Sequence, residues 1–349
     1  MTTVDRPRTS RSIVLTVSDV IEETADARSL VFAVPDDHSR LFRYAPGQFL
    51  TLRIPSDRTG SVARCYSLAS SPFTDSLPKV TVKRTVDGYG SNWVCDNVRI
   101  GDTIEVLPPS GIFTPKNLDD NLLLFGAGSG ITPVMSILKS ALAEGTGAVV
   151  LVYANRDERS VIFAGELREL VARHPSRLTV LHWLESIQGR PAPEQLASLI
   201  APFGEYESFM CGPAPFMAAA RDALTSIGVP RERVHAEAFN SLAGDPFSED
   251  PVDPPADETD AATVDVELDG ESHRLVWPRT RTLVDIMLAK GLDVPYSCRE
   301  GECGSCACTV VEGRVELGNC QVLDPEDIAN GYILACQSRP STDHVRIEF

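Results

Sequence analysis

Four cysteines in the last part of the chain carry its clearest chemical signal. Cys298, Cys303 and Cys306 follow the spacing C-x4-C-x2-C, and 29 residues separate Cys306 from Cys336. Soft thiolate sulfur stabilises iron, and three close ligands on one loop can wrap a rhombic cluster without a regular strand or helix. Because this spacing is typical of plant-type sites, it predicts a [2Fe–2S] cluster held by these four residues.

The loop between the cysteines supports this interpretation. Gly301 and Gly304 let the backbone pass close to the bridging sulfides and offer N–H donors to them. A zinc site is the alternative, but zinc sites usually pair C-x2-C knuckles, which the four-residue gap fits poorly. Cys308 and Cys320 are left over, and we expect small buried thiols or exposed spectators at both positions.

A second group of chemistry-bearing residues lies in the first third of the chain. The stretch R-C-Y-S from Arg64 to Ser67 follows P-G-Q-F at residues 46–49. In this order the motifs resemble the ferredoxin–NADP⁺ reductase superfamily, which implies bound FAD. Arg64 then suits the flavin pyrophosphate, Tyr66 can lie along the flavin ring, and the Ser67 hydroxyl can hydrogen-bond flavin N5. The helix start that would receive phosphates on its N–H groups comprises Gly90, Ser91 and Asn92.

A glycine turn directly after an apolar strand is the third signal. Its sequence G-A-G-S-G-I-T-P departs from the dinucleotide fingerprint G-x-G-x-x-G, because Ile131 occupies the third glycine position. It instead resembles the G-x-G-x-T-P turn of the same superfamily, which implies an NAD(P) pyrophosphate at a helix N-terminus. The candidate residues of this turn are Gly126, Gly128, Gly130, Thr132 and Pro133.

Three further residues are assigned roles through the resemblance. The run C-G-P-A-P-F-M begins at Cys211 and resembles a motif whose cysteine lies beside the nicotinamide C4. Phe239 matches the position from which an aromatic ring covers the flavin, and Lys83 is a further candidate cofactor-binding residue. Taken singly, Cys211 also fits a buried strand end and Phe239 a core residue.

The choice between NADH and NADPH depends on the residues after the second strand of the nucleotide-binding region. Arg156 and Arg159 could pair with a 2′-phosphate, whereas Asp157 and Glu158 would repel it and accept the 2′-hydroxyl. The resemblance favours NADH. Asp157 is therefore the candidate ribose-binding residue.

Three folded regions must position these groups. Residues 1–117 contain short Val-, Ile-, Leu- and Thr-rich runs separated by turn formers, which predicts an antiparallel barrel or sandwich. The resemblance implies that this region is a flavin-binding β-barrel. Residues 118–240 alternate apolar strands with helical stretches, which predicts an α/β domain with a parallel sheet. Residues 241–262 have four prolines and seven acidic groups, which predicts an extended, self-repelling linker. Residues 263–349 mix strands, one helix and the cysteine loop, which resembles an α+β (β-grasp) plant-type ferredoxin domain.

Composition excludes several classes of protein. The chain has 349 residues and a formal net charge of −17, which repels nucleic-acid backbones and anionic membranes. The charge is uneven: residues 1–240 carry −3, residues 241–262 carry −7 and residues 263–349 carry −7. No apolar run reaches the ~18 residues of a membrane span, and the N-terminus lacks the features of a signal peptide. A cytoplasmic protein is therefore expected.

The motif order flavin, nicotinamide, ferredoxin covers essentially the whole chain and is similar to three-domain reductases that serve oxygenases. Stretches such as RYAPGQFLTLRIP, VLHWLES and ILACQSRP resemble the reductase components of 3-ketosteroid 9α-hydroxylases. This resemblance implies that electrons pass from NADH through FAD and the cluster to a Rieske oxygenase in steroid and cholesterol breakdown. The protein would contribute position and electrostatics rather than acid–base catalysis.

Two other functions stay open at the level of sequence. The first is a reductase of the same domain order that serves a di-iron oxygenase of the phenylacetyl-CoA epoxidase type. The second is a cluster-based redox sensor whose nucleotide domain is vestigial.

Overall fold

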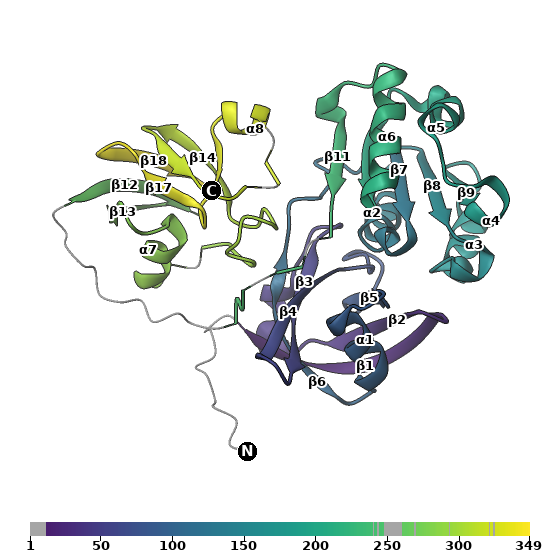
Figure 1. The fold of residues 1–349 in the computed structure, drawn as a ribbon, viewed down its shortest axis with the longest axis horizontal. Helices are drawn as coiled ribbons and strands as arrows, with labels where there is room; N and C mark the ends of the chain where they lie inside the picture. Colours follow the sequence, from purple (N-terminus) through teal and green to yellow (C-terminus); the bar gives the residue numbers. More distant parts are fainter. Residues whose placement is uncertain are drawn as a thin grey trace.

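The computed structural model describes residues 12–239, 241–242, 244–247, 260–268, 270–292, 294–320, 322–323 and 325–349. Three large sheets with separate cores follow one another along the chain, and a two-stranded sheet of residues 315–317 and 338–340 accompanies the third (Figure 1). Most of the predicted linker lies outside the described residues. The predicted fold class, a barrel followed by a parallel α/β unit and a β-grasp unit, is confirmed.

The first sheet has six strands in the order β4-β3-β6-β1-β2-β5, all paired antiparallel. An isolated bridge between Leu68 and Val80 joins the two edge strands and closes the sheet into a barrel. Alternating residues point inward, as the pattern of β1 shows, so one face of each strand builds the core. Its elements are β1 (Ile13–Thr24), β2 (Ala27–Ala33), a 3-10 helix (Asp36–Phe42), β3 (Phe49–Ser56), β4 (Gly60–Ser67), β5 (Lys79–Lys83), α1 (Tyr89–Asn97) and β6 (Thr103–Ser110).

The second sheet has five parallel strands in the order β11-β10-β7-β8-β9. All six residues of β7 and all seven of β8 are buried, since helices cover both faces of a parallel sheet. The chain leaves β7 toward β8 on one side and returns to β10 on the other. Ligands of such sheets bind where the strand order reverses, at the carboxyl ends of β7 and β10.

The helices and strands of this second unit alternate along the chain. They are β7 (Leu122–Ala127), α2 (Ile131–Glu144), β8 (Val149–Asn155), α3 (Ala164–Arg173), β9 (Leu178–Leu184), α4 (Glu185–Gln188), α5 (Pro193–Ile200), β10 (Glu207–Cys211), α6 (Ala214–Ser226) and β11 (Val234–Glu237). Short 3-10 helices lie at Gly128–Gly130, Glu158–Ser160, Ala201–Phe203 and Arg231–Arg233.

The third sheet has the order β13-β12-β18-β14-β16, with β12 and β18 parallel and the other neighbours antiparallel. Helix α7 packs on it, and the fully buried Trp277 lies in the shared core. Sequence patterns indicated two strands and one helix here, whereas five further strands and α8 also form. The elements are β12 (Ala261–Leu268), β13 (Glu271–Pro278), α7 (Leu283–Ala289), β14 (Ala307–Glu312), β15 (Val315–Leu317), α8 (Pro325–Ala329), β16 (Tyr332–Leu334), β17 (Ser338–Pro340) and β18 (His344–Glu348).

The described start of the predicted linker is packed rather than free. Leu242 is 6% exposed and Phe247 is fully buried among residues of the barrel and the cysteine loop. Asp245 accepts a hydrogen bond from Ser61 Oγ at 2.9 Å, and Arg53 lies over the Phe247 ring. A large aromatic side chain and a paired carboxylate therefore anchor this segment to the barrel, which its overall acidity did not predict.

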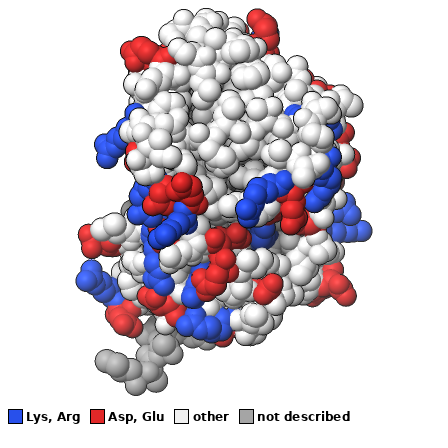
Figure 2. Space-filling view, turned by 90° about the vertical axis from the view of Figure 1, so that its right-hand side faces the viewer, with Lys and Arg blue, Asp and Glu red and all other residues white. Residues whose placement is uncertain are grey.

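Charged side chains of both signs are interspersed over the lower half of the face in Figure 2, whereas the upper part is largely uncharged. Among the described residues, we find no helix with the length and apolar character needed to cross a membrane.

Candidate functional site

The four predicted cluster ligands lie together at one end of the third unit. Cys298, Cys306 and Cys336 are 2–4% exposed, and no disulfide joins any of the described cysteines. Contacts with the Cys303 and Cys336 thiols lower the pKa of Cys298, because they donate hydrogen bonds to its thiolate. The four sulfur atoms thus converge within one small volume.

Backbone amides of the same loop point at these sulfur atoms. The N–H groups of Glu300 and Glu302 both donate to Cys298 Sγ at 3.4 Å, and that of Cys336 donates to Cys306 Sγ at 3.5 Å. Gly301 has a φ of +80°, and a Cβ there would lie 2.0 Å from the Asn319 carbonyl oxygen. Only glycine permits this approach. Converging thiolates with amide donors fit an iron–sulfur cluster, whose sulfur atoms take such hydrogen bonds.

The two surplus cysteines lie apart from this group. Cys308 is 3% exposed on β14 in the domain core, where burial raises the pKa of its thiol. Cys320 is half-buried beside the same core.

Strand β4 brings the predicted flavin-binding residues to the barrel surface. A Cβ added to Gly90, at the start of α1, would lie 2.9 Å from the Arg64 side chain. The Arg64 guanidinium donates to the Ala63 carbonyl at 2.7 Å and lies 3.5 Å from the Leu242 carbonyl. A guanidinium beside the N-terminus of a helix is a fitting place for a pyrophosphate.

The neighbouring predicted residues lie around this strand. Tyr66 packs with Trp93 against the barrel core. The Ser91 hydroxyl accepts from the Thr85 N–H at 3.1 Å, and the Asn92 amide donates to the Thr85 carbonyl at 3.1 Å. Both side chains therefore shape the loop before α1. The N–H groups of the first turn of α1, which have no partner within the helix, are left to bind phosphate.

Glu237 is a half-buried carboxyl that the sequence patterns did not single out. Ser67 Oγ donates to Glu237 Oε2 at 3.3 Å across the barrel and the parallel sheet. Burial raises the pKa of Glu237 to about 8, while the Ser67 hydrogen bond opposes that shift. Cys211, fully buried, is close enough for Glu237 to raise the pKa of its thiol further. The signal available in the sequence was an acidic residue at the carboxyl end of the last parallel strand, where ligands bind.

Phe239 and Lys83 lie near this junction in different surroundings. Phe239 follows Glu237 by two residues and is 49% exposed, so its ring is available to cover a ligand. Lys83 ends β5 of the barrel, and its Nζ lies 3.6 Å from the position a Cβ would take on Gly128. Burial lowers the pKa of Lys83, with Asp26 opposing the shift.

The glycine turn lies at the switch point of the parallel sheet. A Cβ on Gly130 would lie 2.1 Å from the Cys211 carbonyl oxygen, so the turn closes tightly on the end of β10. Thr132 Oγ1 donates to the Ser129 carbonyl at 3.0 Å, and the first residues of α2 are buried. Gly126, at the end of β7, packs against Ile131. A helix N-terminus behind a glycine turn fits a dinucleotide pyrophosphate.

The residues after β8 have partners that bear on coenzyme choice. The Asp157 carboxylate caps the short helix at residues 158–160 by accepting from the Ser160 N–H at 3.0 Å. Arg156 Nη2 donates to Asp26 Oδ2 of the barrel at 2.8 Å. One of the two arginines that could meet a 2′-phosphate is therefore engaged with a carboxylate, whereas Arg159 is exposed.

The cysteine loop lies against the same barrel strand that carries Ser67. Cys298 is buried with Ala63, Leu107 and Phe247, and Cys65 of β4 packs beside it. Thr51 Oγ1 and Ser297 Oγ are 2.7 Å apart and both residues are at most 1% exposed. Strand β4 thus contacts the last parallel strand through Ser67 and the cysteine loop through Cys65.

Comparison with known proteins matches all three units. Family models for an oxidoreductase FAD-binding domain, an oxidoreductase NAD-binding domain and a 2Fe-2S iron-sulfur cluster binding domain match residues 14–114, 124–222 and 266–341. The predicted cofactors FAD, a nicotinamide nucleotide and [2Fe–2S] are confirmed at the level of these domains. The chain is an oxidoreductase.

Individual relatives cover the chain from end to end. It is 71% identical to the ferredoxin reductase component of 3-ketosteroid-9-alpha-monooxygenase from Rhodococcus rhodochrous, over 100% of both chains. Identity to a component of the 1,2-phenylacetyl-CoA epoxidase of Escherichia coli is 34%, over 96% of this chain and 97% of that one. The structure of phthalate dioxygenase reductase matches with a TM-score of 0.57 and 25% identity, covering 97% of this chain and 98% of that one. On this full-length identity, the chain belongs to the family of 3-ketosteroid-9-alpha-monooxygenase ferredoxin reductase components.

Proposed function

We propose that this protein takes electrons from NADH and delivers them singly to a Rieske oxygenase that hydroxylates 3-ketosteroids, in the cytoplasm. The observation that carries the proposal is the meeting of three sites on strand β4. Ser67 contacts Glu237 at the nicotinamide side, and Cys65 packs beside the predicted cluster ligand Cys298. The steroid assignment follows the 71% identical relative.

The division of labour follows from the chemistry of the three groups. When bound, the nicotinamide supplies a hydride, the flavin accepts it and the cluster carries away one electron at a time. The chain's own residues bind and orient these groups. We assign Arg64 and the α1 N-terminus to the flavin pyrophosphate, the turn from Gly126 to Pro133 to the nucleotide pyrophosphate, and Cys211 to the nicotinamide ring.

The junction between the barrel and the parallel sheet also controls a proton. Glu237 is half-buried at this junction, and its loss of hydration raises its pKa to about 8, so its carboxyl holds a proton at neutral pH. It can share that proton with the Ser67 hydroxyl, its hydrogen-bond partner. The sequence predicts no acid–base catalysis, and so it assigns no role to the pair of Ser67 and Glu237.

NADH is favoured over NADPH by charges around the adenosine ribose. Asp26 of the barrel engages Arg156, one of the two arginines that could meet a 2′-phosphate, and lies 4.0 Å from Lys83. We expect a Michaelis constant for NADPH at least about tenfold above that for NADH, since an added phosphate meets Asp157 and Glu158 while Arg156 is already paired with a carboxylate.

Turnover with defined partners tests the function. Purified protein and NADH are combined with a Rieske steroid 9α-hydroxylase oxygenase or with the di-iron oxygenase of phenylacetyl-CoA epoxidase, and product is quantified. We expect steroid hydroxylation alone to be supported. Epoxidation alone would move the assignment to the di-iron systems. If NADH does not bleach the flavin, and no electrons pass through the protein to cytochrome c, the function would instead be that of a cluster-based redox sensor.

The acidic third unit bears on how the partner docks. Residues 263–349 carry −7 against −3 for residues 1–240, so a basic surface on the oxygenase would be steered toward it. Electron delivery should then slow as ionic strength rises, while flavin reduction by NADH barely changes. A flat salt profile of the delivery step would assign the charge to solubility alone.

A further inference from the structure

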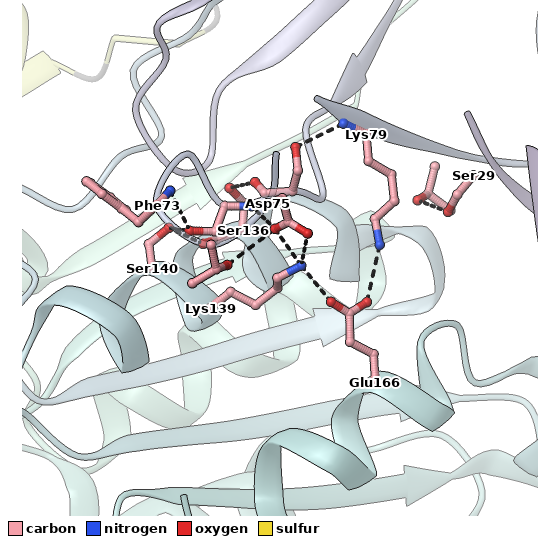
Figure 3. Close-up of polar contacts among 12 residues, drawn as sticks. Ser29, Phe73, Asp75, Lys79, Ser136, Lys139, Ser140 and Glu166 are labelled. Atoms are coloured by element: carbon pink, nitrogen blue, oxygen red, sulfur yellow. Dashed lines mark hydrogen bonds and ion pairs between the residues drawn. The ribbon is translucent and has the colours of Figure 1, made fainter. Parts of the chain in front are cut away.

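One buried and three half-buried charged side chains join the barrel to the parallel sheet, away from the residues assigned to cofactors. Lys139 of α2 is 6% exposed, and its Nζ lies 2.7 Å from Asp75 Oδ2 and 2.6 Å from Glu166 Oε1. Lys79 of β5 lies 3.2 Å from the other Glu166 oxygen and 5.0 Å from the Phe163 ring centroid. Figure 3 shows these side chains meeting from both units. We name this set the seam cluster: Asp75, Lys79, Lys139 and Glu166.

A row of buried hydroxyls continues the seam along α2. Ser136 Oγ donates to the Ser70 carbonyl at 2.6 Å, and the hydroxyls of Ser140 and Ser71 are 2.8 Å apart (Figure 3). All four serines are fully buried. Positions 136, 139 and 140 lie on one face of a helix, so α2 presents a single polar stripe to the barrel.

Polar groups of this kind are costly as a source of stability alone. Charges taken from water lose hydration that their pairing only partly restores, and an apolar seam of the same volume is often equally stable. A polar seam instead fixes the position of helix α2 relative to the barrel, because each hydrogen-bond donor fits one acceptor. Asp75, for example, also accepts from the Ser71 N–H at 2.7 Å and so fixes the loop that holds it.

The seam joins two segments, each of which begins at one of the predicted reacting sites. The loop that carries Ser70 and Asp75 begins directly after Ser67 of β4. Helix α2, which carries Ser136 and Lys139, begins at the predicted pyrophosphate turn, and Ser136 is about one turn from Thr132. The hydrogen bond between Ser136 and Ser70 therefore ties the nicotinamide side to the flavin side through a few residues of fixed backbone.

We propose that Lys139 is a positioning residue for hydride transfer: through Asp75 and Glu166 it fixes the nucleotide-binding helix against the flavin-binding strand. The proposal rests on the proposed function, in which the nicotinamide is reduced coenzyme and the acceptor is the flavin. Transfer between two bound rings depends steeply on their separation, and a misplacement of about 1 Å can cost about a hundredfold in rate.

Replacing Lys139 with Met tests the role in the holoenzyme. Stopped-flow measurement should show flavin reduction at saturating NADH slowed by about 10 to 100 times, with the NADH concentration for half-saturation changed less than about threefold. Electron transfer from flavin to cluster, started by photoreduction, should keep its wild-type rate. Lys116→Met, at an exposed lysine between barrel and sheet, is the control and should leave every rate unchanged.

A second variant separates positioning from loss of stability. Lys139→Met alone leaves Asp75 without its cation, whereas Asp75→Asn with Lys139→Met leaves the balanced pair of Lys79 and Glu166. We expect the double variant to regain the wild-type melting temperature but to reduce its flavin slowly. Amide hydrogen exchange should also stay faster in the loop around Ser71 and in the first turn of α2.

The outcomes differ for the two proposals. Recovery of the flavin-reduction rate together with the melting temperature in the double variant would overturn positioning and leave a purely structural seam. Wild-type rates in Lys139→Met would overturn it as well. If the wild-type protein itself fails to reduce its flavin with NADH, the proposed function fails instead.

Discussion

The barrel makes two contacts of opposite character with its neighbours. Its contact with the parallel sheet contains ion pairs around Lys139, which is only 6% exposed, and a row of buried hydroxyls. Toward the cysteine loop it presents the hydrogen bond between Thr51 and Ser297 and a small apolar cluster around Phe247. Beside that cluster Ile112 faces Gly304 and is still 51% exposed.

The polar contact and the apolar contact differ because one has to support hydride transfer and the other single-electron transfer. Hydride transfer needs reacting atoms held at about 3–3.5 Å, so the contact that aligns them must keep one register. A single electron can leave over a greater separation, and the cluster also has to meet a second protein. A contact with few directional bonds suits a unit that must load at one place and unload at another.

Removing a predicted cluster ligand should have the largest effect, because it would separate flavin reduction from electron delivery completely. In Cys336→Ser the [2Fe–2S] signal in the EPR spectrum should be lost or distorted and delivery to the oxygenase abolished, while NADH still reduces the flavin. Cys320→Ser and Cys308→Ser are the controls and should keep the cluster. An unchanged EPR signal in Cys336→Ser would overturn the ligand assignment.

Locking the contact between the barrel and the cysteine loop with a disulfide should have the next largest effect. The Thr51 and Ser297 hydroxyls are 2.7 Å apart, a separation that a disulfide of about 2 Å can replace. In the oxidised Thr51→Cys, Ser297→Cys variant we expect flavin-to-cluster transfer to continue and reduction of the oxygenase to fall at least about tenfold. Reduction of the disulfide in the same sample is the control and should restore delivery. Equal delivery in both states would show that this contact does not need to open.

Removing the Arg64 guanidinium from strand β4 should release the flavin. Arg64→Ala removes the charge-assisted contact to the pyrophosphate that we propose, worth about 1.5–3 kcal/mol, so flavin retention should fall by about 10 to 100 times. Flavin content after dialysis measures it. Full retention would remove Arg64 from the site, and recovery of FMN instead of FAD would change the cofactor but not the pocket.

Titration of Glu237 should give the most gradual effect, spread over several pH units, and it probes how closed the contact between the barrel and the parallel sheet is. Its folded-state pKa of about 8 exceeds the ordinary 4.5, so the folded chain holds an extra proton between these values. The free energy of unfolding should therefore fall by about 1 kcal/mol per pH unit as the pH rises from about 5 to 8, and level off above. Urea unfolding measures this slope. It should vanish in Glu237→Gln, and a persistent slope would mean that another group is responsible.

Motifs that are local in the chain could be predicted because their chemistry depends on spacing along one loop. The cysteine loop and the glycine turn are of this kind. The fold class also followed from pattern, since continuous apolar runs indicate parallel strands and frequent turn formers indicate a barrel. The packed segment around Phe247 was mistaken for free linker, because composition averages over single anchoring residues.

The amino-acid order alone established which cofactors the chain is built for, because a thiolate spacing and a glycine turn each act within a few residues. The surroundings of those cofactor sites depend on the packed fold. Ser67 and Glu237 are 170 positions apart, and Thr51 and Ser297 are 246 apart. No periodicity links such residues, and they meet only because separate sheets pack on one face of the barrel. The burial that raises the pKa of Glu237 and encloses Lys139 is likewise a property of the packed units, not of the local chain.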